Sequence, residues 1–370
     1  MTRKAGIYIH IPFCVRRCSY CDFTSYTKIN LIPEYVNALK KEIELRKDKV
    51  KDLIFDSIYL GGGTPSLLRS SDIAGILDSL YKFYKISKNV ESTIEANPES
   101  ISLMKLKLYK SLNIGRLSIG VQSFDNKVLS GIERTHSEYD ALKAIELARD
   151  ASFNNLNIDL IVGLPYSDLH TFGLNINAIR KSKPEHVSLY MLIREKNTKL
   201  SKKVAKGVIF LANEDCIVYY WNKYVKFLKE GSYIHYEISN FALKGFECRH
   251  NLHYWMRDPY IGFGISASSF LNKERTTNTK SIQLYVKRIR ENKNIITFIE
   301  EVDEKKKREE EIMLGLRLLS KGIGREFISY EKKDSIEKFI SLRLLKEKRG
   351  KLCLTEEGVC LSSQVISELF

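Results

Sequence analysis

The sequence predicts an α/β protein: a partial (β/α)6, TIM-like barrel followed by a mostly helical, winged-helix-like C-terminal domain. Apolar, β-branched runs alternate with segments of helical periodicity through about the first 230 residues, which is typical of βα units around a parallel sheet. No nucleotide-binding GxGxxG turn follows the first strand, so a Rossmann sheet is disfavoured. Several residues with polar or chemically useful groups fall at or just past the C-terminal ends of expected strands, where parallel α/β folds place their chemistry: Cys14, 61–64, Glu95, Gln122 and Asp159.

Six strands are expected in this first part, at residues 7–11, 57–60, 92–96, 116–121, 156–162 and 186–190. A helix is expected at 33–47, with Pro33 in its first turn, where the missing N–H is tolerated. The next helix is expected to begin after Ser71. Each later strand is again followed by a helical pattern, which gives the repeating unit of a barrel.

The pattern changes after about Tyr236. The following segment is rich in glycine, histidine and aromatic residues, and the chain then becomes helical at 283–290 and 304–319. Residues 344–354 predict a hairpin around Arg349 and Gly350. We therefore expect a core at 1–235, a connecting region at 236–280 and a winged-helix-type domain at 281–370, for which packing is favoured over DNA binding.

Composition narrows the class of protein. The 370 residues are 44% hydrophobic and carry a net charge of +15, from 60 Lys and Arg against 45 Asp and Glu. No apolar run is long enough to cross a bilayer and no secretory signal is evident, so a cytoplasmic protein with reduced cysteines is expected. The lysines are scattered, and the densest run, 305–307, is followed by glutamates, which favours a solvated helix face over a nucleic-acid footprint.

The strongest motif is the cysteine cluster Cys14-Val-Arg-Arg-Cys18-Ser-Tyr-Cys21, directly after the first expected strand. Iron–sulfur clusters ordinarily use four cysteines, so three leave one iron open to an exogenous ligand. A zinc site completed by His10 is the structural alternative, but paired C-x2-4-C spacing is absent. A thioredoxin-like pair of Cys18 and Cys21 would leave Cys14 without a role.

C-x3-C-x2-C with an aromatic before the third cysteine resembles the radical SAM superfamily, in which S-adenosylmethionine chelates the open iron. Further blocks resemble its coproporphyrinogen III oxidase-like branch: YIHIPFC (8–14), GGGTP (61–65), E-x-N-P-E (95–99), GVQSF (120–124) and I-D-L-I-x-G-L-P (158–165). The resemblance implies a [4Fe-4S] cluster on Cys14, Cys18 and Cys21. It also implies S-adenosylmethionine contacts from Tyr8, Gly62, Gly63, Thr64, Glu95, Gln122, Arg134 and Asp159.

Two departures from the oxidase pattern select a subgroup. The oxidases carry another cysteine two positions after the third, where this chain has Phe23 after Asp22, and a longer segment before their first strand. Both features, with the H-N-x-x-Y-W motif at 250–255, resemble the HemW group, regarded as haem chaperones. The resemblance implies haem contacts from His250, Tyr254 and Trp255, and imidazole is a common axial ligand of haem iron.

The expected function is therefore a chaperone that binds haem as cargo and transfers it to an acceptor protein, on a radical SAM scaffold that is not a true oxidase. The alternative is an oxygen-independent coproporphyrinogen III oxidase in porphyrin metabolism, which performs radical decarboxylation. An electron donor is implied as a further partner, and nucleic acid is not. Transient membrane contact and a homodimer are left open, whereas an integral membrane segment is not expected.

Overall fold

The computed structural model describes residues 3–370 and is built around a 12-stranded sheet. Its strands lie in the order β12-β11-β10-β9-β1-β2-β3-β4-β5-β6-β8-β7. The six strands that come first in the chain are β1 (Arg3–Ile11), β2 (Leu53–Gly62), β3 (Ile86–Ala96), β4 (Arg116–Gln122), β5 (Leu156–Val162) and β6 (His186–Met191). Each of them pairs in parallel with the next. The partial barrel and parallel α/β class are thereby confirmed.

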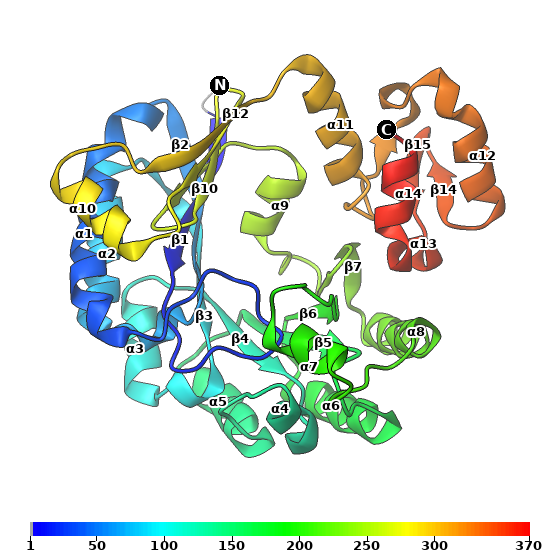
Figure 1. The fold of residues 1–370 in the computed structure, drawn as a ribbon, viewed down its shortest axis with the longest axis horizontal. Helices are drawn as coiled ribbons and strands as arrows, with labels where there is room; N and C mark the ends of the chain where they lie inside the picture. Colours follow the sequence, from blue (N-terminus) through cyan, green and yellow to red (C-terminus); the bar gives the residue numbers. More distant parts are fainter. Residues whose placement is uncertain (1–2) are drawn as a thin grey trace.

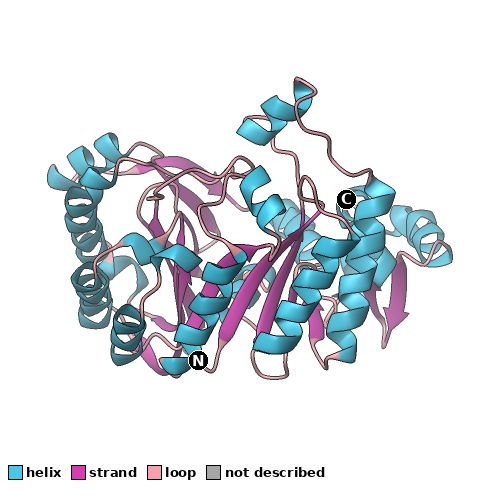
Figure 2. Cartoon of the chain, turned by 90° about the horizontal axis from the view of Figure 1, so that it is seen from below, coloured by secondary structure: helices cyan, strands magenta, loops and turns pink. Residues whose placement is uncertain are grey.

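Helices cover the outer side of the curved sheet (Figures 1 and 2). They are α1 (Ile32–Leu45), α2 (Ser70–Phe83), α3 (Leu103–Ser111), α4 (Asn126–Gly131), α5 (Glu138–Asp150), α6 (Leu169–Ser182) and α8 (Glu214–Glu230). The short helix α7 (Lys199–Ala205) lies instead beside the loop that follows β1. Proline in the first turn of α1 and capping boxes at α5 and α6 fix where these helices begin. Aliphatic residues of β1 and β2 such as Ile7 and Ile58 are fully buried.

The segment after β6 extends the sheet at both ends. β7 (Ile234–Glu237) and β8 (Asn240–Ala242) form an antiparallel edge next to β6, while β9 (Tyr260–Phe263) pairs in parallel with β1. β10 (Ser268–Leu271), β11 (Glu274–Asn278) and β12 (Ile296–Glu301) continue the sheet beyond β9. The division expected at 235/236 falls inside β7, and the three-part division of the chain stays a prediction.

The C-terminal module forms one side of the molecule (Figure 1). It contains α11 (Glu304–Gly315), α12 (Lys333–Ser341), α13 (Glu356–Cys360), α14 (Ser362–Glu368) and a small sheet of β13 (Ile323–Gly324), β14 (Leu345–Lys348) and β15 (Lys351–Leu354). Two backbone hydrogen bonds join it to β7: Ile238 N donates to Arg317 O (3.1 Å) and Leu319 N donates to Tyr236 O (3.1 Å). α10 (Ile282–Arg290) packs instead against α1.

A buried carboxylate fastens the strands after β9 to α1. Glu42 is fully buried, pairs with Arg46 (2.8 Å) and accepts hydrogen bonds from Tyr285 OH (2.6 Å), Gly264 N (2.8 Å) and Asn278 Nδ2 (3.0 Å). Tyr285, Gly264 and Asn278 lie more than 200 residues further along the chain, so the network closes the fold across that separation. Among residues 3–370, no helix is long and apolar enough to span a membrane.

Candidate functional site

The cysteine loop follows β1 and is held at several points by backbone hydrogen bonds. Cys14 N donates to Tyr26 O (3.0 Å), Ser19 N donates to Ile132 O (3.1 Å), and Leu200 N of α7 donates to Ser19 O (2.8 Å). Cys14, Cys18 and Cys21 are free thiols of intermediate exposure. The loop is therefore ordered by its neighbours and presents thiols that external ligands can reach.

The three thiols influence one another. Burial raises the pKa of Cys14 and raises that of Cys21 to about 11, and the charge of neighbouring thiols of the trio adds to both effects. Two side-chain donors face the sulfurs: Thr64 Oγ1 donates to Cys14 Sγ (3.7 Å) and Arg134 donates to Cys18 Sγ (3.5 Å). Hydrogen bonds to sulfur stabilise thiolates as metal ligands.

The donor set suits an iron–sulfur cube better than a single metal ion. Within residues 3–370, no three His, Cys, Asp or Glu side chains are grouped as a metal-ion site. Thiolates of a cube each bind a different iron, so they need not meet at one point. His10 does not support the zinc alternative, because both of its ring nitrogens have hydrogen-bond partners: Nδ1 bonds Tyr8 OH (3.0 Å) and Nε2 bonds Thr24 O (3.0 Å).

Glycines at the end of β2 allow the cysteine loop to approach the sheet. Gly62 has a φ of +115°, and a Cβ added there would lie 2.6 Å from the His10 ring. A Cβ at Gly63 would lie 2.7 Å from Phe13 O. A side chain at either position would clash with neighbouring atoms of the protein, so both positions require glycine. The sequence alone did not reveal this cause.

Two partly buried carboxylates line the inside of the barrel. Glu95, near the end of β3, accepts hydrogen bonds from Tyr59 OH (2.8 Å) and Gly62 N (3.0 Å). Burial and the charge of Asp159 raise the pKa of Glu95 to about 7. Asp159 accepts from Asn157 Nδ2 (2.7 Å), and burial raises its pKa as well. Asp159 lies in the middle of β5, so its expected position at the strand's end is wrong.

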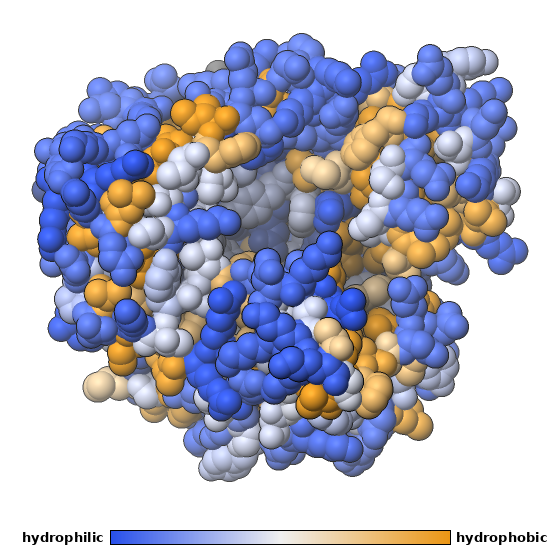
Figure 3. Space-filling model, in the orientation of Figure 1, coloured by the Kyte–Doolittle hydropathy of each residue, from blue (hydrophilic) through white to orange (hydrophobic). Residues whose placement is uncertain are grey.

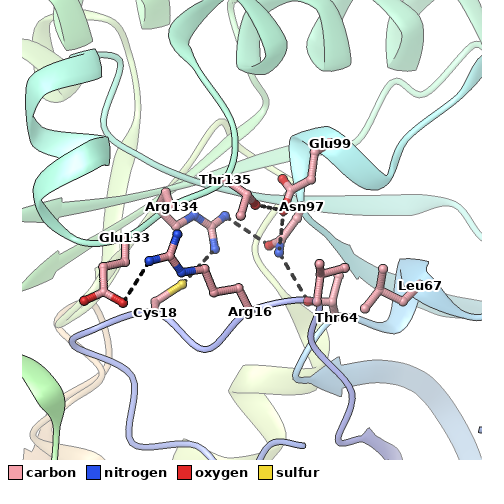
Figure 4. A pocket seen from close by; sticks show the side chains of 10 residues that line it. Arg16, Cys18, Thr64, Leu67, Asn97, Glu99, Glu133, Arg134 and Thr135 are labelled. Carbon is pink, nitrogen blue, oxygen red and sulfur yellow. Dashed lines mark hydrogen bonds and ion pairs between the residues drawn. The ribbon is translucent and has the colours of Figure 1, made fainter. Parts of the chain in front are cut away.

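Arg134 connects the cysteine loop to the sheet (Figure 4). Its guanidinium donates to Asn97 Oδ1 (3.0 Å) and to Gly120 O as well as to Cys18. Asn97 Nδ2 in turn donates to Thr64 Oγ1 (3.2 Å). Sequence reasoning missed Asn97, although it is the central residue of the quoted E-x-N-P-E block. Gln122 ends β4 with a φ of +70°.

Short helix α9 (Arg249–Trp255) carries the motif expected to contact haem. His250 is 1% exposed, and its two ring nitrogens bond Ser57 Oγ (2.9 Å) and Tyr254 OH (2.9 Å). Its ring stacks on Tyr59 (centroids 5.1 Å apart), and burial lowers its pKa to about 3. Iron ligation by His250 stays a prediction, and it requires the ring nitrogen that binds iron to give up its hydrogen-bond partner.

His253, one turn of helix away, is held differently. Its Nε2 bonds Asp56 Oδ1 (2.7 Å) and its Nδ1 bonds Asp258 Oδ2 (2.9 Å). Burial opposes its charge, but the two carboxylates outweigh that effect and raise its pKa to about 9. Both histidines therefore fasten α9 to the barrel, whereas Tyr254 and Trp255 are only half-buried.

Comparisons with known proteins agree first on the class of protein. The family model described as the radical SAM superfamily matches residues 8–174. Among solved structures, coproporphyrinogen III oxidase (HemN) from Escherichia coli superposes with a TM-score of 0.84, covering 99% of this chain and 90% of that one. At 20% identity this likeness shows the fold alone. The fold is that of the radical SAM proteins.

Relatives of higher identity define the family within that class. The protein named heme chaperone HemW from Lactococcus lactis is 33% identical over 100% of this chain and 98% of its own length. The HemW proteins of Bacillus subtilis (35% identity, 84% of this chain, 82% of that protein) and Buchnera aphidicola from Schizaphis graminum (40%, 71% and 69%) also match. The chain belongs to the HemW family.

Proposed function

We propose that this protein binds haem and passes it to an acceptor protein, and that Cys14, Cys18 and Cys21 hold a [4Fe-4S] cluster with S-adenosylmethionine on the open iron. The observation that carries the proposal is the match to a HemW relative over 98% of that protein's length. It includes the cysteine loop and α9, because it spans the whole of this chain. The likeness to the oxidase is one of fold and carries no activity.

The residues around the cysteines have the chemistry that a [4Fe-4S] cluster and S-adenosylmethionine need. Thr64 and Arg134 donate to two of the thiols and so hold them in position as ligands. Glu95 and Asp159 supply acceptors for the hydroxyl and amino groups of S-adenosylmethionine, and Tyr8, Gln122 and the backbone at Gly62 and Gly63 complete the expected contacts. When bound and reduced, the cluster supplies one electron to the sulfonium of S-adenosylmethionine.

Haem is proposed to bind at α9. Tyr254 and Trp255 are half-buried and offer aromatic surface, which packs well against a porphyrin face. The molecular surface is hollowed over α9, between the barrel and the C-terminal module (Figure 3). His250 already has the neutral imidazole that iron binds, and ligation through Nε2 would replace its bond to Tyr254 while Nδ1 keeps its bond to Ser57.

Anaerobic reconstitution followed by haem titration tests the proposal. We expect iron and sulfide to load on the wild-type chain, haem addition to give a saturable Soret band, and His250→Ala to shift or weaken it. His170→Ala, at an exposed residue of α6, serves as the control. An unchanged Soret spectrum, or protoporphyrinogen formation from coproporphyrinogen III that depends on Cys14, would overturn the proposal in favour of no haem function or of the oxidase.

A further inference from the structure

An arginine beside α9 lacks a partner. Arg317 follows α11, where the C-terminal module joins β7, and its carbonyl accepts from Ile238 N. Its guanidinium lies over the Trp255 ring, with Cζ 5.2 Å from the ring centroid. Among residues 3–370 it forms no ion pair, and its buried Nε has no hydrogen-bond acceptor. A buried guanidinium donor without an acceptor is unfavourable, because hydration is lost and nothing replaces it.

Three other arginines of low exposure form ion pairs, and Arg134, whose Nε also lacks an acceptor, donates through its other nitrogens to Cys18, Asn97 and Gly120. Arg46 bonds Glu42 (2.8 Å), Arg257 bonds Glu310 (2.8 Å) and Arg275 bonds both Glu300 and Glu310. Each of these pairs joins separate elements of the fold or successive turns of α1. Arg317 departs from this pattern, although it is packed between the barrel and the C-terminal module.

No nearby carboxylate of the protein is available to Arg317. The charge of Glu237 reaches it, but Glu237 is fully buried and its oxygens accept from Asn240 Nδ2 and from Ser239 N (3.3 Å). Burial lowers the pKa of Arg317, as expected for a cation without a contacting counter-ion. An anion that paired with Arg317 would therefore have to come from a ligand or partner.

A second donor lies against the first. The indole Nε1 of Trp255 is buried and has no acceptor within the described chain. The two unpartnered donors, one of them on a planar charged fork, suit an acceptor with two coplanar oxygens, which is a carboxylate. The surface is hollowed over α9, the helix that carries Trp255, and the proposed function places haem there (Figure 3). Haem carries propionate carboxylates at one edge and an apolar face that packs on aromatic rings.

We infer that Arg317 and the indole N–H of Trp255 bind a propionate carboxylate of the haem cargo. The inference rests on the proposed function, since it assigns a second contact at the same site. It makes the C-terminal module part of the haem site: the segment directly after α11 supplies the backbone position of the cation, and α9 supplies the ring on which it lies. Binding would convert an unpaired, partly buried cation into an ion pair, so propionate recognition would contribute strongly to affinity.

Haemin and its dimethyl ester, which lacks the propionate charge, test the assignment on the reconstituted full-length protein. We expect wild type to bind haemin about tenfold or more tightly than the ester. Arg317→Ala should weaken the binding of haemin by a similar factor and leave the binding of the ester unchanged, so this variant should no longer prefer haemin. Trp255→Phe, which keeps a ring and removes the donor, should lose part of the preference. Arg325→Ala, at a partly exposed residue of the same module, should bind as wild type.

The outcomes separate the inference from the proposed function. If wild type binds neither haemin nor the ester, the proposed function is wrong. If both bind but Arg317→Ala weakens them equally, or weakens neither, haem binding stands and the role of Arg317 is refuted. If Arg317→Ala fails to fold by circular dichroism, Arg317→Lys and Trp255→Phe decide: an unaltered haemin-to-ester preference in both refutes the assignment.

Discussion

The ion pairs of His253 predict a loss of stability in alkaline solution. Its imidazolium lies between Asp56 (2.7 Å) and Asp258 (2.9 Å), and Lys4 also pairs with Asp56 (3.3 Å). Burial opposes the charge on His253, and that charge in turn lowers the pKa of the neighbouring His250. The carboxylates prevail, and the pKa of His253 rises from 6.5 to about 9. Protonation of this one ring is therefore linked to folding.

The direction of the effect follows from the two pKa values of His253. Below pH 6.5 both the folded and the unfolded chains hold the proton, and the stabilisation is fully present. Between 6.5 and about 9 the unfolded chain releases it while the folded chain keeps it, so stability falls with pH. At about 1.4 kcal/mol for each pH unit, the full contribution is about 3 kcal/mol, of which about 2 kcal/mol is lost between pH 7 and pH 9.

Urea unfolding from pH 7 to pH 9 measures this contribution. The folded chain also releases protons from Glu95 and Glu237 in this range, because their pKa values are about 7. Unfolded cysteines titrate here as well, since the raised pKa values of Cys21 and Cys248, about 11 and 12, belong to the folded chain. His253→Gln should therefore be less stable than wild type at pH 7, and its stability should fall less steeply with pH than that of wild type. His170→Gln, at an exposed site, should keep the wild-type slope. Equal slopes for wild type and His253→Gln would refute the reasoning.

Three further predictions concern the cysteine loop and its supports. Cys14→Ser should abolish iron and sulfide loading on reconstitution, whereas Cys353→Ser, in β15, should load as wild type. Glu42→Gln should lower the free energy of unfolding by about 3–5 kcal/mol in urea titrations, because a buried Arg46 loses its charged partner. Gly62→Ala should lower the free energy of unfolding by about 1–3 kcal/mol, because the φ of Gly62 is positive and an added Cβ would meet the His10 ring. Gly173 has open space around it, so Gly173→Ala should not destabilise the protein in the same urea titrations.

The parallel half of the fold could be predicted because its strands are buried on both faces. Such strands appear in a sequence as continuous apolar runs, and the run at 156–162 coincides with β5. Helix ends were also readable within a few residues where a cap marks them, as at Pro33 in α1. These signals are local, so one sequence is enough to show them.

The second half could not be predicted because its signals are weak or non-local. β8 has three residues, and β11, of sequence ERTTN, owes its place to pairing with β10 and β12 rather than to an apolar run. The run of lysines and glutamates in α11 predicted a solvated helix face, but one of its glutamates is buried. Glu310 is 5% exposed and pairs with Arg257 and Arg275, which no pattern within that run reveals.

The two histidines of α9 show why a motif does not determine what its residues do. His250 and His253 are one turn apart and both are buried, but only His250 occupies a fixed position of the H-N-x-x-Y-W motif. Burial keeps His250 neutral, with a pKa of about 3, whereas two carboxylates outweigh burial and keep His253 charged, with a pKa of about 9. Only a neutral imidazole has a lone pair for iron, and a charged one would first have to give up a proton and two ion pairs. The partners, which come from β2, from α9 and from the loop after it, therefore favour His250 over His253 for the proposed haem contact and make His253 an anchor of the helix. Release of Tyr254 would free the Nε2 of His250 while the ion pairs of His253 still hold the helix on the barrel.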